Sequence, residues 1–206
     1  MNKEILSGQV RLDIGCSNHK LPNYIGVDLS KEDGVDVVAD LHNLPFAASS
    51  VDIVHTRHTL EHVKEPLVCI SELYRICRAG GRIVIIVPHY SNPAYWADVT
   101  HLRPFSVRAF EYFDLEFANK AGFPIYLPNV HLRTISAKLI WWPKRLIIRK
   151  SFLKRGLIRL IKRIIQPMLN INATISERFL TQIVGGFYEV EFILEPVKES
   201  HSPSTK

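Results

Sequence analysis

The first half of the chain alternates short apolar runs with one helical pattern. Apolar residues recur at helical spacing between Leu60 and Arg78, at Val63, Leu67, Ile70, Leu73, Tyr74 and Cys77. The strand-like runs lie at Val10–Gly15, Tyr24–Leu29, Val35–Leu41, Val51–Thr56 and Arg82–Pro88. Continuous apolar strands separated by helices are typical of a buried, mostly parallel sheet, so the pattern predicts an α/β fold.

The second half is less regular. Residues 88–113 are rich in aromatic residues, His and Pro, which predicts a long loop with a short helix. Residues 143–166 predict a basic helix or helical pair. Residues 187–198 alternate in the manner of an antiparallel edge strand, and we expect the tail, residues 199–206, to be disordered.

Composition and charge limit the class of protein. The chain has 206 residues, is 47% hydrophobic and 22% charged, and contains three cysteines. These values favour one globular domain over residues 1–198, with reduced thiols in the cytoplasm. The first ten residues resemble no signal peptide, and no apolar run is long enough to predict a transmembrane helix.

Acidic residues stand where the first three strands end, at Asp13, Asp28 and Asp40. Ligands of parallel sheets bind beyond these strand ends. A carboxylate at Asp28 can accept hydrogen bonds from ribose hydroxyls, and one at Asp40 can accept from an adenine amine. Gly15 lets the backbone approach a ligand because it lacks a Cβ, and Leu29 and Leu41 can sandwich a flat base.

Five segments in order, LDIGCS, GVDLS, ADLHNLPF, VDIVHTRHTLEHV and RAGGRIVIIVP, resemble the successive motifs of the S-adenosylmethionine (SAM)-dependent methyltransferases. The resemblance is to class I, type 11-like members and covers residues 10–88. It implies a three-layer Rossmann-like sandwich with a mostly parallel seven-stranded sheet and an antiparallel C-terminal strand. A nicotinamide-binding domain is the structural rival, but its G-x-G-x-x-G turn is absent.

The resemblance also implies SAM as cofactor and assigns residues to it. Asp28 would bind the ribose, and Asp40 would hold the adenine, with Leu29 and Leu41 on either side of the ring. Asp13, Gly15, Cys16 and Ser17 would line the methionine part, and His55 and Arg57 would face the methionine part or the substrate. Only fifteen positions separate Asp13 from Asp28, so we expect the first helix to be very short.

The methyl acceptor is expected beside the loop after the fifth strand, residues 87–105. Positioning supplies much of the rate of methyl transfer, and an oxygen acceptor also needs a base. His101 is the preferred base, with Asp98 as its orienting partner and His89 as second choice. A structural lid is the alternative for this loop. No Cys or His spacing suggests a metal ligand set, so we predict no metal.

Residues 117–176 contain twelve Lys and Arg and no acidic residue, while the rest of the chain has fourteen basic and twenty acidic residues. Within this segment, residues 143–167 predict a helical insertion with an apolar face, a basic face and two preceding tryptophans. That pattern favours contact with an anionic membrane surface, on the inner face of the membrane. A helix packed on the domain and a nucleic-acid surface are the alternatives.

These observations together predict a SAM-dependent methyltransferase. Its acceptor would be a small molecule, a glycan or a lipid-linked compound, and the basic segment favours one presented at a membrane. An RNA methyltransferase and a non-catalytic SAM-binding protein are the other hypotheses.

Overall fold

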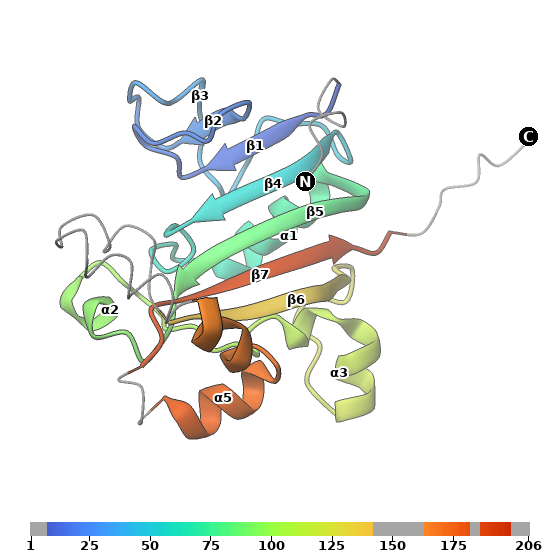
Figure 1. The fold of residues 1–206 in the computed structure, drawn as a ribbon. Coiled ribbons are helices and arrows are strands. Elements are labelled where there is room, and N and C mark those ends of the chain that lie inside the picture. Colours follow the sequence, from blue (N-terminus) through green and yellow to red (C-terminus); the bar gives the residue numbers. More distant parts are fainter. Residues whose placement is uncertain (1–7, 142–162, 182–185, 199–206) are drawn as a thin grey trace, which may run out of the picture.

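The computed structural model describes residues 8–141, 163–181 and 186–198, which form a seven-stranded sheet with helices around it (Figure 1). The strand order is β3-β2-β1-β4-β5-β7-β6. The strands are β1 (Arg11–Ile14), β2 (Ile25–Asp28), β3 (Val37–Val38), β4 (Val51–Arg57), β5 (Cys77–Pro88), β6 (Leu132–Ile140) and β7 (Glu189–Pro196). This order and the mostly parallel pairing confirm the predicted Rossmann-like fold. Residues 15–24, between β1 and β2, form turns without a helix, so the first helix, which was expected to be very short, is absent there.

The C-terminal strand is antiparallel, as predicted, but its position differs from the prediction. We expected an edge strand, whereas β7 pairs with β5 on one side and β6 on the other. Its Val190, Phe192 and Leu194 are fully buried, because each faces the core while its neighbours in sequence face the other way. The edge is β6, a strand that the hydrophobic pattern did not predict.

Helix α1 (Pro66–Ile76) is shorter than the predicted pattern. It begins at Pro66 because proline is favoured in the first helical turn and disfavours helix in the residue before it. Val63 therefore precedes the helix, and Leu67 is 37% exposed instead of packed. Its buried face consists of Cys69, Ile70, Leu73 and Ile76.

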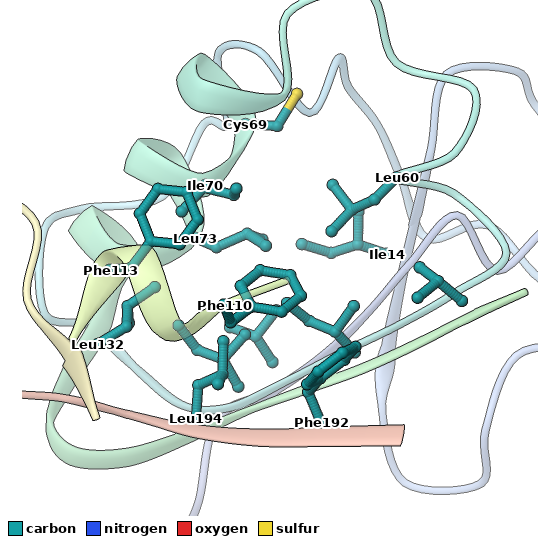
Figure 2. Close-up of a cluster of buried hydrophobic side chains, with 14 of the residues drawn as sticks. Ile14, Leu60, Cys69, Ile70, Leu73, Phe110, Phe113, Leu132, Phe192 and Leu194 are labelled. Carbon is teal, nitrogen blue, oxygen red and sulfur yellow. The ribbon is translucent and has the colours of Figure 1, made fainter. Parts of the chain in front are cut away.

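The main core lies between α1 and the sheet (Figure 2). Ile70 and Leu73 of α1 face Ile14 of β1 and Leu60, which follows β4. Aromatic residues extend this core toward β7, where the Phe110 and Phe192 rings have centroids 4.7 Å apart. Burial of such side chains stabilises the fold by roughly 1.5–3 kcal/mol each.

The second half contains α2 (Pro93–Ala97), the 3-10 helix η2 (Glu111–Phe113), α3 (Leu115–Ala121) and α5 (Ala173–Leu180). The short helix α2 confirms the prediction for residues 88–113. The capping residues of α3 and α5 are visible in the sequence. The side chains of Asp114 and Asn172 accept hydrogen bonds from backbone N–H groups in the first turns of α3 and α5, and Gly122 ends α3 with φ +70°.

Most of the predicted basic helix, residues 143–162, and the tail, residues 199–206, lie outside the described residues. Residues 163–169 are helical. Within the part that is described, no helix is long and apolar enough to cross a membrane.

Gly15 marks the closest approach of the loop after β1 to the turn after β4. Its φ is +73°, and a Cβ at this position would lie 2.0 Å from Thr59 Oγ1. The Thr59 hydroxyl donates a hydrogen bond of 3.4 Å to the carbonyl oxygen of Ile14, the residue before Gly15. A side chain at residue 15 would force these two segments apart.

We expect Gly15→Ala to destabilise the protein much more than Gly80→Ala. Gly80 has a similar φ of +69° but open space around it, so Gly80→Ala carries only backbone strain, about 1–2 kcal/mol. Gly15→Ala adds a steric clash, which costs about a further 1–3 kcal/mol. Urea unfolding of both variants measures the difference, and equal losses would mean that the Thr59 contact is not a constraint.

Helix α5 is anchored by a buried carboxylate. Glu177 Oε1 accepts hydrogen bonds from His89 Nε2 and the Val107 backbone N–H, both at 2.8 Å, and Oε2 accepts from Ser106 Oγ at 3.1 Å. Burial opposes the charge of Glu177, but these bonds, above all that from His89, lower its pKa. Glu177 therefore joins α5 to the segment that follows β5.

Removing this carboxylate should weaken the fold. Glu177→Ala leaves His89 and the Val107 N–H buried without their acceptor, a loss typically of about 3–5 kcal/mol for a broken buried pair. Because the folded pKa of Glu177 is lowered, its contribution is present above the unfolded value of 4.5 and is lost as pH falls below it. Stability measured from pH 7 to pH 3 should therefore fall more steeply in the wild type than in Glu177→Gln. The exposed Glu116→Gln serves as control, and a Glu177→Gln profile parallel to the wild type would contradict the assignment.

Candidate functional site

Two neighbouring pockets open at the carboxyl ends of the parallel strands. The first, of about 620 Å³, lies beside β2, the loop after β3 and the turn after β4. The second, of about 460 Å³, lies beside β1, the end of β4 and the start of β7. Gly15, Ser17 and His58 line both pockets, so the two form one continuous site.

All ten residues that the sequence assigned to a cofactor line this site. The first pocket contains Asp28, Leu29, Asp40 and Leu41, and the second contains Asp13, Cys16, His55 and Arg57, with Gly15 and Ser17 common to both. The fold brings these residues together from four different strand ends. Their individual roles stay predictions.

In the first pocket, two carboxylates are held by backbone groups. Asp28 accepts hydrogen bonds from the N–H of Ser17 at 2.9 Å and of Ser30 at 3.3 Å. Asp40 accepts from the backbone N–H of His42 and lies 2.6 Å from its ring Nδ1, and these bonds lower the Asp40 pKa. Leu41 is buried, whereas Leu29 is 69% exposed at the rim.

The second pocket holds an aspartate–histidine pair. Asp13 Oδ1 lies 2.7 Å from His55 Nδ1, and Asp13 Oδ2 accepts from the Leu21 N–H at 2.8 Å. Both side chains are largely buried. Cys16 is a buried thiol whose pKa is raised by burial and by nearby Asp13 and Asp28, so it is a lining residue and not a reactive thiolate.

A charged network forms the far wall of the second pocket. Glu189 Oε1 accepts from Arg57 Nη2 at 2.6 Å and lies 2.9 Å from His58 Nε2, while His58 Nδ1 lies 3.1 Å from Glu61 Oε1. Burial lowers the pKa of His58, but the hydrogen bonds to Glu189 and Glu61 outweigh it and raise the pKa to about 9. His58 is therefore a cation at neutral pH, and Arg57 Nε has no hydrogen-bond partner among the described residues.

Glu189 and Glu61 were not found by sequence reasoning. A signal existed for Glu189, since a charged residue in the apolar run FYEVEF is unusual at a buried position. Glu61 stands within the segment VDIVHTRHTLEHV, but its burial became visible only when the loop after β5, whose Leu102 N–H donates to the Glu61 carbonyl, was placed on the turn after β4.

The residues predicted as catalytic lie elsewhere. His89 is fully buried, with Nε2 on Glu177 and Nδ1 2.6 Å from Ser91 Oγ, so it holds α5 and cannot contact an acceptor in this conformation. His101 and Asp98 are not among the residues lining either pocket. His101 Nδ1 lies 2.8 Å from the Tyr95 carbonyl oxygen, which orients the ring. Asp98 Oδ2 is 3.7 Å from His101 Nε2, too far for a hydrogen bond, so a backbone carbonyl takes the orienting role that was expected of Asp98.

Comparison with known proteins agrees with this geometry. Residues 12–85 match the family model described as a methyltransferase domain. The chain is 29% identical, over 109 aligned residues, to a protein from Streptomyces fradiae described as an uncharacterized 37.1 kDa protein in transposon TN4556. That match covers 41% of this chain and 32% of the relative, so the chain spans about a third of the relative's length.

Solved structures share the fold at low identity. A SAM-dependent methyltransferase from Archaeoglobus fulgidus has a TM-score of 0.56 and 20% identity, over 92% of this chain and 87% of that one. The [4+2]-cyclase SpnF has a TM-score of 0.53 and 17% identity, over 94% and 78%. The fold therefore hosts more than one reaction. Residues 12–85 therefore match the methyltransferase-domain family, and the described residues share the fold of a SAM-dependent methyltransferase.

Proposed function

We propose that the protein binds SAM across the two pockets and transfers its methyl group to an acceptor presented at an anionic lipid surface. One observation carries the cofactor part: Asp28 and Asp40 line the first pocket, and the adjoining second pocket contains the guanidinium of Arg57. SAM carries a ribose and an adenine amine at one end and an amino acid carboxylate at the other. Carboxylate acceptors in the first pocket and a guanidinium donor in the second suit the two ends of that molecule.

The residues present fit each part of the cofactor. Asp28 would accept from the ribose hydroxyls, and Asp40 from the adenine amine, with Leu41 and Leu29 against the ring. The guanidinium of Arg57, whose Nε has no hydrogen-bond partner among the described residues, would supply a donor for the carboxylate. The bound cofactor supplies an electrophilic methyl group on its sulfonium.

The protein's task is then to hold an acceptor in line with that methyl group. Such positioning can by itself accelerate methyl transfer greatly. A hydroxyl acceptor must also lose a proton. His55 lines the second pocket and is held at Nδ1 by Asp13, an arrangement suited to a proton acceptor. This assignment moves the base from His101 to His55.

Two features of the chain after β6 support a lipid-linked acceptor. The last residue of β6, Ile140, pairs with Glu189, which lines the second pocket, and residues 142–162 follow β6 in the sequence. Those residues contain eight Lys and Arg and no acid. The described residues that follow are rich in exposed apolar side chains: Ile164, Met168, Ile171, Ile175 and Phe179 are each more than half exposed. Cations and exposed apolar groups together are what an anionic membrane surface binds.

We expect Asp28→Ala to weaken SAM binding at least about tenfold. The variant loses charged acceptors for the ribose, worth roughly 1.5–3 kcal/mol per hydrogen bond. Isothermal titration calorimetry with SAM measures the change, and Asp33→Ala, on an exposed position nearby that lines neither pocket, is the control. Unchanged affinity in a folded Asp28→Ala variant would refute the ribose assignment.

We also expect the protein to float with anionic liposomes at low salt and to lose that binding as salt rises. Each cation near the surface contributes about 1 kcal/mol at modest ionic strength. Replacing Ile171 and Ile175 with Ser should weaken flotation without lowering Tm, since both side chains are exposed. Failure to float with anionic vesicles would eliminate the membrane proposal, and salt-sensitive binding to RNA in its place would favour an RNA acceptor.

A further inference from the structure

Three potential metal ligands meet beside the first pocket. Glu61 and His62 lie in the turn after β4, and His101 lies in the loop after β5. One ligand atom from each lies within 4.8 Å of the others, and no other such group occurs among the described residues. His62 also lines the first pocket.

Glu61 is the least satisfied polar group of this cluster. Its side chain is completely buried. Oε1 is 3.1 Å from His58 Nδ1, while the buried Oε2 has no hydrogen-bond partner among the described residues. A buried carboxylate oxygen without a partner is costly, so a cation at Oε2 would stabilise the folded protein.

The hydrogen bonds of the two imidazoles leave a lone pair on each. His101 Nδ1 lies 2.8 Å from the Tyr95 carbonyl, which can only accept, so Nδ1 carries the proton and Nε2 is free to act as a ligand. The Thr100 hydroxyl donates to Asp98 Oδ1 at 2.6 Å and therefore accepts from His62 Nδ1 at 2.9 Å. His62 Nε2 is thus also a free ligand atom.

We propose that Glu61 Oε2, His62 Nε2 and His101 Nε2 bind a divalent transition metal ion of the Zn²⁺ class. Two imidazoles and one carboxylate form a ligand set typical of zinc, and the outer bonds from Tyr95, Thr100 and His58 orient all three. Zn–N bonds of about 2.1 Å place tetrahedral ligands about 3.4 Å apart, so binding would draw the three side chains closer. Asp98 Oδ2 is 3.7 Å from His101 Nε2 but does not belong to the cluster of three ligands.

Such an ion would tie two segments that border the site. The turn after β4 lines the first pocket through Thr59 and His62, and the loop after β5 already touches it through the Leu102 N–H, which donates to the Glu61 carbonyl at 2.7 Å. The metal would hold that loop against the pocket. Metal binding does not depend on the proposed methyl transfer.

Calorimetry of the untagged, chelator-stripped protein with ZnCl₂ tests the proposal. We expect one ion per chain, bound at least about tenfold more weakly in His62→Gln and in His101→Gln. His131→Gln, which removes an imidazole elsewhere, is the matched control and should bind as the wild type does. Addition of Co²⁺ should produce a visible absorption band in the wild type and in His131→Gln. The band should be absent in His62→Gln.

His62 is exposed, so His62→Gln should fold normally, and circular dichroism together with SAM binding checks this. The proposal is overturned if the wild type binds no zinc ion at one per chain, or if His62→Gln and His131→Gln bind it equally. A protein that binds zinc at this cluster but does not bind SAM would retain the metal site and lose the proposed function.

Discussion

The close approach of Gly15 to Thr59 is the constraint on which the site depends. The two pockets meet at this point, because Gly15 lines both of them and Thr59 lies in the wall of the first. The contact also fixes the distance between the loop after β1 and the turn after β4. Asp28 adds a second tie by accepting the Ser17 N–H, so a predicted ligand-binding carboxylate also orders the loop beside it.

The reversed direction of β7 gives the site its charge pattern. Parallel strands present their last residues at the ligand-binding edge, but β7 runs the other way and presents its first residue, Glu189. That carboxylate pairs with Arg57 and His58 and holds the Arg57 guanidinium in the second pocket. Asp28 and Asp40 line the first pocket, so the two pockets offer different groups to a ligand that spans them.

Histidines with similar surroundings in the sequence have different roles in the fold. His89 anchors α5 through Glu177, His55 is held by Asp13 within a pocket, and His101 belongs to the cluster with Glu61 and His62. Each role depends on a partner at least thirty positions away in sequence. The proposed metal site in particular departs from the prediction of no metal. That prediction was based on local spacing, whereas these ligands join residues 61 and 62 to residue 101.

The sequence by itself determined the Rossmann-like fold class and the parallel strands, and it named ten residues that line the two pockets. These follow from local information: apolar runs, and glycine or acidic residues that stand at strand ends. Only the tertiary structure decided that β7 is internal, that Glu189 lines the second pocket with Glu61 behind His58, and that His89 is buried against Glu177. The reason is physical: pairing across the sheet and burial depend on contacts between distant segments, and neither leaves a periodic pattern in the segment that carries the residue.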